Sequence, residues 1–218
     1  MILKISGRRC KMAAIARSPF AHRLGQTHVL RESDNLVIHD LTPTGRTGFK
    51  GAGTSDWLAS KVSALPERPN RAVTLSDGTV VARLGKEEYL VLNGRGSSDD
   101  VSAELDLSWA SESANGAIRM GYPLPRADSH SWLFLEGVRV PEMMSKICGV
   151  DLRDARFPPG EIAQTIVARI GAVLIREIGA GSEGLHLLTD FASADYLWEV
   201  LDDASAEYGG GFAPAGRK

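Results

Sequence analysis

Short apolar runs alternate with turn residues through the first half of the chain and predict several strands and two helices. The strands are expected at 35–41, 45–51, 71–75, 79–85 and 88–93, and the helices between Thr54 or Ser55 and Pro66 and over 97–110. Leu58, Val62 and Leu65 form one apolar stripe on the first helix. Ser76-Asp77-Gly78 separates two β-branched runs, which indicates a hairpin.

The second half repeats this order of elements. Strands are expected at 131–137, 161–171, 172–179 and 184–190, with a helix over 140–149 and a last helix from about Phe191 to Tyr208. Pro141 at the first helical position and Gly149 after the last one mark the ends of the 140–149 helix. The last helix places six residues on one face, namely Ala194, Leu197, Trp198, Leu201, Ala204 and Tyr208.

Two nearly identical strings, VVARLG at 80–85 and IVARIG at 166–171, suggest an internal duplication. Each string lies 29 positions after a glycine that precedes a predicted helix, Gly51 in one case and Gly137 in the other. We therefore predict an α+β fold of two pseudo-repeated β-α-β-β-(β)-α lobes, in which the two strings are equivalent strands and Arg83 corresponds to Arg169.

The composition places these lobes between two tails. We expect a basic N-terminal arm over 1–31, a first lobe over 32–112, a linker over 113–129, a second lobe over 130–208 and a disordered tail over 209–218. All 27 acidic residues lie at or after Glu32, whereas seven of the 25 basic residues precede it. A transit segment and a nucleic-acid arm are open alternatives, but an arm lying on an acidic partner is favoured.

Residue types that support catalysis are scattered along the sequence. Cys10 and Cys148 are read as unpaired thiols, and none of the five histidines, His22, His28, His39, His130 and His186, has a metal-ligand spacing. The two within strands, His39 and His186, are read as half-buried and hydrogen-bonded. We therefore predict no catalytic, cofactor-binding or metal-binding residue on this chain.

Two glycine-rich strings could hold an anion but have simpler explanations. G-x-G-x-x-G at 179–184 lies between two strand-like runs, so it is read as a hairpin loop rather than a dinucleotide site. GFKGAG at 48–53 precedes a helix, and close backbone packing accounts for its glycines as well as phosphate binding does. No apolar run approaches the roughly 20 residues of a membrane-spanning helix.

Several longer strings carry a family resemblance. They are ARSPFAH, DLTPTGRTGFKGAG, LPERPNRAV, VVARLGKEEYLVL, FPPGEIAQTIVARIGAVLIRE and LLTDFASADYLWEVL. Together they cover about residues 16–208 and resemble the folate-binding aminomethyltransferase family, typified by the glycine-cleavage T-protein. The chain is more closely similar to the gamma subunits of heterotetrameric sarcosine oxidases.

The resemblance implies a non-catalytic, cytoplasmic gamma subunit that stabilises flavin-bearing partners. Its alpha, beta and delta partners would hold FAD, FMN, NAD, tetrahydrofolate and zinc, while the complex demethylates sarcosine to glycine and passes the one-carbon unit to tetrahydrofolate. It implies no contact with nucleic acid or membrane. The T-protein relatives place an aspartate in an N-x-x-G-G style turn, but this chain has only LSDGTVV, so the catalytic role is not transferred to Asp77. The open alternatives are the equivalent subunit of N-methylglutamate dehydrogenase and a free-standing folate-dependent aminomethyltransferase.

Overall fold

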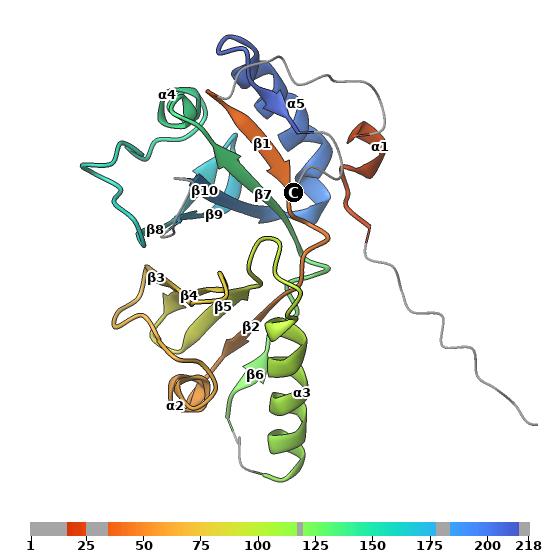
Figure 1. Ribbon diagram of the computed structural model, residues 1–218, viewed down its shortest axis with the longest axis vertical. Coiled ribbons are helices and arrows are strands. Elements are labelled where there is room, and N and C mark those ends of the chain that lie inside the picture. The colour runs from red at the N-terminus through yellow and green to blue at the C-terminus, as the bar shows by residue number, and fades with distance from the viewer. Residues whose placement is uncertain (1–16, 25–34, 117–119, 178–183, 214–218) are drawn as a thin grey trace, which may run out of the picture.

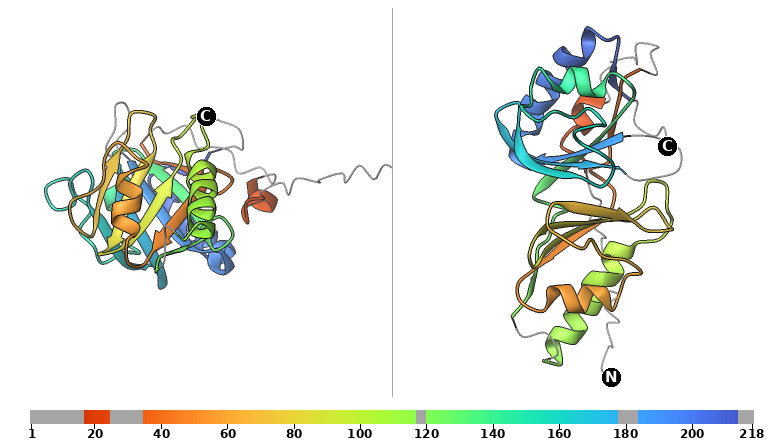
Figure 2. Two further views of the ribbon diagram at one scale, coloured as in Figure 1. Left: turned by 90° about the horizontal axis from the view of Figure 1, so that it is seen from below. Right: turned by 90° about the vertical axis from the view of Figure 1, so that its left-hand side faces the viewer.

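Two mainly antiparallel β-sheets pack face to face, and helices cover the outer face of each sheet (Figure 1). This is a computed structural model, and it describes residues 17–24, 35–116, 120–177 and 184–213. The right-hand view in Figure 2 shows four layers, helices, sheet, sheet and helices, along the long axis of the molecule. The predicted α+β class is confirmed.

The first lobe contains a five-stranded sheet in the order β3-β4-β5-β2-β6. Its elements are β2 (Arg46–Lys50), α2 (Thr54–Ala59), β3 (Arg71–Thr74), β4 (Val80–Gly85), β5 (Glu88–Leu92), α3 (Val101–Ala114) and β6 (Tyr122–Pro123). Strands β4 and β5 read as continuous apolar runs because both of their faces are buried. Val81 and Val91 face α2 and α3, whereas Val80 and Leu92 face the other sheet.

The second lobe contains a six-stranded sheet in the order β11-β1-β7-β10-β9-β8. Its elements are β1 (Val37–Asp40), β7 (His130–Glu136), α4 (Val140–Met144), β8 (Ile162–Val167), β9 (Ile170–Arg176), β10 (Gly184–Asp190), the 3-10 turn η1 (Phe191–Ser193), α5 (Ala194–Ala206) and β11 (Gly211–Phe212). A short helix, α1 (Ala21–Leu24), precedes them. Five of the six residues predicted for the buried face of α5 are buried, and Tyr208 packs at its edge.

Each lobe has the predicted series of a strand, a helix, further strands and a helix, and the two sheets share one strand order. The series β3-β4-β5-β2-β6 in one sheet corresponds to β8-β9-β10-β7-β1 in the other. Gly51 and Gly137 occupy equivalent turns with positive φ angles of 106° and 117°. A Cβ atom at Gly51 would meet the Met120 carbonyl, and one at Gly137 would meet the Asn35 carbonyl. Close backbone packing, rather than anion binding, therefore explains the glycine at this strand-to-helix turn.

The predicted register of the repeat is wrong. VVARLG is strand β4, but IVARIG spans the end of β8, a two-residue turn and the start of β9. Arg83 lies within a strand, whereas Arg169 lies in the turn with a φ of 64°. The segment 145–161 is longer than its counterpart 60–70, so the offset of 86 residues between the lobes changes after the first helix.

The expected boundaries also differ from the arrangement of the sheets. Strand β1 lies within 32–112 but belongs to the second sheet, and β6 lies within the expected linker 113–129 but pairs with β2. Residues 209–213 of the tail are ordered, because β11 pairs with β1 and Phe212 is buried. Phe20 of the expected arm is fully buried in the same core. Positions 1–16 and 25–31 of the expected arm lie outside the described residues, as do positions 214–218 of the tail.

Three helices differ in extent from the prediction, and one of them, α4, ends at Met144 although a helix was expected over 140–149. Helix α2 ends at Ala59, so Val62 and Leu65 extend the apolar stripe from the loop that follows, where they pack against the same core. Helix α3 begins at Val101, and Asp100 rather than a serine caps it by accepting a hydrogen bond from the backbone of Ala103. Capping by Asp100 therefore marks where α3 begins.

Candidate functional site

A cavity of about 230 Å³ lies between the two sheets. Both lobes line it, with Leu84, Glu88 and Leu90 from the first sheet, Gln164, Val173 and Leu188 from the second, and Arg126 and His130 from the segment that joins them. Half of these side chains are apolar and half are polar. This mixture of apolar walls and a few convergent polar groups is typical of small-molecule sites.

Arg46 holds the segment that carries Arg126 and His130. Its guanidinium group is buried and donates hydrogen bonds to the backbone carbonyls of Arg126, Ala127 and His130. It also bonds two carbonyls in the turn before β2. Burial lowers the pKa of Arg46 to about 10, so the group remains charged at neutral pH. One side chain thus determines the backbone path at the edge of the cavity.

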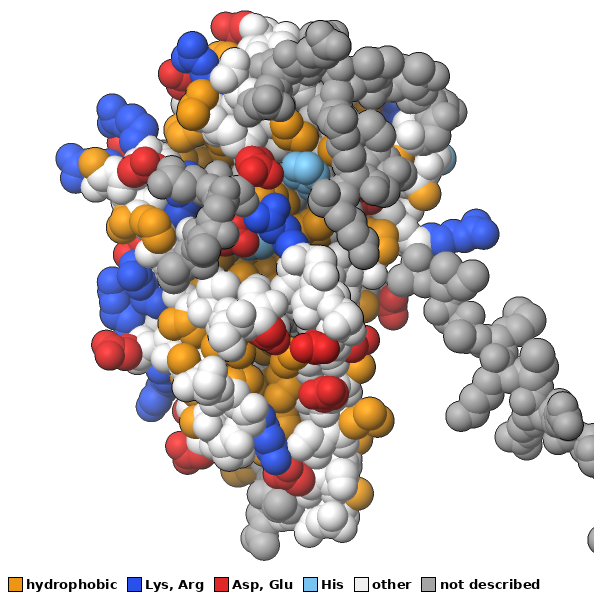
Figure 3. All heavy atoms as spheres, viewed as in Figure 1, with side chains coloured by type: hydrophobic (Ala, Val, Ile, Leu, Met, Phe, Trp, Pro, Cys, Tyr) orange, Lys and Arg blue, Asp and Glu red, His pale blue; other side chains and the backbone are white. Residues whose placement is uncertain are grey.

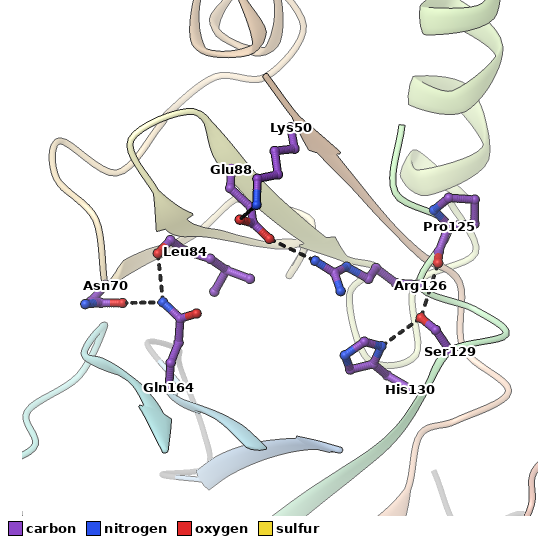
Figure 4. A network of polar contacts seen from close by, with 9 residues as sticks. All are labelled: Lys50, Asn70, Leu84, Glu88, Pro125, Arg126, Ser129, His130 and Gln164. Carbon is purple, nitrogen blue, oxygen red and sulfur yellow. Dashed lines mark hydrogen bonds and ion pairs between the residues drawn. The ribbon is translucent and has the colours of Figure 1, made fainter. Parts of the chain in front are cut away.

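Lys50, Glu88 and Arg126 form a line of charges from the surface to the cavity (Figure 4). The Glu88 carboxylate accepts from Lys50 Nζ at 2.8 Å and from Arg126 Nη2 at 3.1 Å. The hydrogen bond to Glu88 raises the pKa of Lys50, so the three groups carry a net charge of one positive unit. The Arg126 Nε atom is buried and has no hydrogen-bond partner within the described part of the chain.

Gln164 links the two lobes beside the cavity. Its amide nitrogen donates to Asn70 Oδ1 and to the Leu84 carbonyl, both at 2.8 Å, and both acceptors belong to the first lobe. The amide oxygen therefore remains as an acceptor, and it faces the space between the sheets in Figure 4. These two hydrogen bonds hold Gln164 in place at the wall of the cavity and leave its amide oxygen available as an acceptor.

His130 lines the cavity with its imidazole ring. The Ser129 hydroxyl oxygen lies 2.7 Å from His130 Nδ1 and 3.2 Å from the Pro125 carbonyl, so Ser129 links the ring to the backbone of the same segment. Burial, reinforced by the positive charges of Arg126 and Arg46, lowers the pKa of His130 below its ordinary value, so the ring is neutral at pH 7.

A second polar cluster contains both strand histidines singled out in the sequence. His186 is fully buried in β10 and accepts a hydrogen bond at Nδ1 from the Trp132 indole at 3.1 Å. Its Nε2 lies 4.0 Å from Glu177, which pairs with Arg95 at 3.1 Å. His39 contacts Glu136 at 3.4 Å, and burial lowers its pKa. Charged groups of both signs gather around a histidine at this junction of the lobes (Figure 3).

The other candidate residues have structural roles or lie outside the described part of the chain. Asp77 accepts from the backbone and hydroxyl of Thr79 within the β3–β4 turn, and Cys148 is buried. Within 17–24, 35–116, 120–177 and 184–213, no three potential metal ligands lie close together. No helix of that part is long and apolar enough to cross a membrane. Cys10, His28 and most of the 179–184 loop are not among the described residues.

Comparison with known protein families shows to which family this chain belongs. The family model of the sarcosine oxidase gamma subunits matches residues 66–207, about two thirds of the chain. The chain belongs to this family.

Relatives of the gamma-subunit family differ in how much of their length the chain covers. The sarcosine oxidase gamma subunit of an Arthrobacter species is 23% identical over 89% of this chain and 92% of its own length. An aminomethyltransferase of Saccharopolyspora erythraea is 29% identical, but the match covers only 35% of that protein. A match to the aminomethyltransferase of Geobacillus thermodenitrificans, 26% identical, covers 51% of that relative. The chain thus spans a third to a half of these aminomethyltransferases.

Solved structures show the same fold. A chain of the heterotetrameric sarcosine oxidase of Corynebacterium sp. U-96, in complex with pyrrole 2-carboxylate, superposes with a TM-score of 0.69 at 22% identity, covering 88% of this chain and 96% of that one. The glycine-cleavage aminomethyltransferase T of Bartonella henselae gives a TM-score of 0.59 at 10% identity, covering 84% of this chain and 49% of that one. The predicted similarity to the T-protein fold is confirmed.

The cavity residues were not identified from the sequence. Arg46 bonds backbone carbonyls, Arg126 bonds Glu88, and Gln164 bonds Asn70 and the Leu84 carbonyl. These partners are distant in the chain and leave no motif in the sequence. His130 was considered only for metal spacing. The one available signal was an arginine inside the strand predicted at 45–51; the strand is buried in the structure, and a buried arginine must have partners.

Proposed function

We propose that this chain is the structural gamma subunit of a heterotetrameric sarcosine oxidase and that it stabilises the flavin-bearing subunits. The observation that carries the proposal is the share of each relative's length that the chain matches. It matches a gamma subunit over nearly that subunit's whole length, but only part of each aminomethyltransferase. Alpha, beta and delta partners would supply the flavins, NAD, tetrahydrofolate and zinc in the cytoplasm. The complex would convert sarcosine to glycine and transfer the one-carbon unit to tetrahydrofolate.

The small volume of the cavity supports a structural rather than a catalytic role for this chain. The cavity of about 230 Å³ is smaller than the roughly 300–1,000 Å³ of pockets that enclose drug-sized ligands. A whole folate molecule does not fit in it. The polar groups around the cavity also hold one another and the backbone, as Arg46 and Gln164 do. These contacts support a scaffold role.

Co-expression of the partner subunits with and without this chain tests the proposal. We expect omission to lower the yield of the alpha–beta assembly and its oxidation of sarcosine. Adding purified chain to the depleted assembly should restore activity, which separates assembly from effects on expression. Assaying N-methylglutamate in parallel distinguishes the dehydrogenase alternative. Unchanged yield and activity without the chain would contradict the proposal.

A free-standing aminomethyltransferase is the second candidate, favoured by the 29% identity with the Saccharopolyspora enzyme. Titration of the isolated chain with tetrahydrofolate tests it. Saturable binding together with aminomethyl transfer would support this candidate, and absence of binding at high micromolar ligand would exclude it.

A further inference from the structure

The second sheet has an edge strand that the first sheet lacks. Strand β11 pairs with the outer edge of β1, whereas no described residue forms a strand beyond β6, which takes the place of β1 in the first sheet. Phe212 of β11 stacks on Trp198 of α5 with ring centroids 3.5 Å apart, and Phe20 lies beside both rings. The chain itself therefore closes the groove between edge strand and helix in the second lobe.

The corresponding groove of the first lobe is open. Helix α3 and strand β6 lie side by side (Figure 1) and border a groove of about 520 Å³. Its lining residues are Asp106, Trp109, Ala110 and Ser113 of α3, and Gly121, Pro123 and Pro125 of β6 and its flanks. The lining stretch of α3 rises about 10 Å, which equals three residues of an extended chain at about 3.3 Å each. The groove thus has the length to hold a short extended segment.

The two grooves differ in the chemistry of their helices. Helix α3 presents Asp106 to its groove, whereas α5 presents Trp198. Each of the two follows a buried leucine, Leu105 or Leu197, and precedes another buried residue by three positions. The two side chains therefore occupy equivalent helical positions. A purely apolar segment such as β11 would bury the carboxylate without a cation, which is unfavourable.

The open groove lies in an acidic part of the chain. Asp106 accepts a hydrogen bond from Thr47 at 2.6 Å, and the groups of the described chain that act on its pKa include no cation. Segment 97–116 contains five acidic residues and no lysine or arginine, and Figure 3 shows acidic side chains over the first turns of α3. Lys61, which approaches the same helix, is already paired with Glu112. The charge of the groove therefore favours a cationic occupant.

We propose that this groove receives a segment of a partner subunit that places an arginine or lysine against Asp106. The cation bonds the carboxylate, while its aliphatic stem covers the apolar wall formed by Trp109 and the two prolines. Pro123 and Pro125 have no N–H group with which to extend the sheet, so side-chain contacts provide most of the affinity. The inference rests on the proposed function for the existence of a partner subunit.

Affinity for the partner subunits tests the role of the carboxylate. Binding of the full chain to the co-purified partner subunits, measured by biolayer interferometry, should weaken about tenfold for Asp106→Asn, because a charge-assisted hydrogen bond becomes a neutral one. Asp106→Arg should weaken it further through repulsion. Glu104→Gln is the matched control, since it removes one charge from the same helix outside the groove and should bind like the wild type. Equal affinity of all variants and wild type would overturn the proposal.

Thiol labelling shows whether the groove is covered. Ala110→Cys in a Cys10→Ser background should react with N-ethylmaleimide in the free chain and at least tenfold more slowly in the assembled complex. Ser111→Cys, an exposed position that does not line the groove, should react equally fast in both. Unchanged labelling of Ala110→Cys in a complex that does form would overturn this inference alone, whereas failure to form a complex would contradict the proposed function.

Two other occupants give different results in the free chain. Slow labelling of Ala110→Cys that becomes fast when residues 1–16 are deleted would identify the basic arm as the occupant. Slow labelling that depends on protein concentration, together with a dimer in sedimentation, would identify a second copy of the chain. Either result would overturn the proposal of a partner segment.

Discussion

A neutral, fully buried His186 should make the protein less stable as the pH falls. Its Nδ1 accepts a hydrogen bond from the Trp132 indole, so protonation there would break that bond. Burial, reinforced by the charge of Arg95, lowers the pKa of His186 to about 3 from its ordinary value of 6.5. The unfolded chain therefore binds this proton more readily than the folded one, and stability present above pH 6.5 is lost as the pH falls toward 3.

The magnitude follows from this difference in pKa. Between pH 7 and pH 5, proton binding to His186 in the unfolded state should lower the free energy of unfolding by about 2 kcal/mol. His39 and His130 also have lowered pKa values and contribute in the same direction. The contribution of His186 must therefore be measured as a difference between the wild type and a variant.

His186→Asn isolates this contribution, because the Asn Oδ1 atom can accept the Trp132 hydrogen bond but does not titrate. Urea unfolding at pH 7 and pH 5 should show that the variant loses about 2 kcal/mol less than the wild type over this interval. His22→Asn, at an exposed position, is the matched control and should behave like the wild type. An equal loss of stability in wild type and His186→Asn would refute the assignment of a buried neutral imidazole.

Three further predictions concern stability in urea. Arg46→Met should lower the free energy of unfolding by about 3 kcal/mol because five backbone carbonyls lose their donor, and a change below ~1 kcal/mol would contradict this. Gly184→Ala should lower it by about 2 kcal/mol because the new Cβ would overlap the Phe134 ring, whereas Gly149→Ala meets no atom within 4 Å and should be nearly neutral. Arg169→Gly should raise it by about 1 kcal/mol by relieving a left-handed backbone, and a loss of stability would disprove that strain.

Elements that are determined by residues close together in the sequence were predictable. The Asp-Gly turn between β3 and β4 and the buried face of α5 depend on neighbouring residues, and both are confirmed. The repeated series of strand, helix, strands and helix along the chain was predictable as well. Such features depend on contacts within a few residues along the chain.

Features that depend on distant contacts were not predictable. The β8–β9 turn uses Ala168 and Arg169 in left-handed conformations, without the glycine or asparagine that usually marks such a turn. The glycines after α5 suggested disorder, but Gly210 lies against Leu36, where a Cβ would come within 2.6 Å of its carbonyl oxygen. Phe212 then stacks on Trp198, with ring centroids 3.5 Å apart. These packing partners are far from each other in sequence.

The same holds for the cavity. Arg126 lies in a segment rich in proline and small residues that resembled a linker, and hydrogen bonds from Arg46 and to Glu88 hold it at the site. Gln164 lies on β8, and the sequence pattern of that strand does not single it out. It links the two lobes because its amide nitrogen donates to Asn70 and to the Leu84 carbonyl of the other lobe. Composition alone carries no information about such pairings.

The exchange of edge strands between the lobes affects how the chain folds during synthesis. The first sheet is complete once residue 123 has emerged, because all five of its strands precede that point. Strand β1 emerges before any of them, yet its partner β7 follows the whole first sheet and its other partner, β11, is the last strand to be made. When residue 123 has emerged, the strands of the first sheet can therefore all pair, while β1 is still unpaired. The second sheet becomes complete only when β11 has emerged.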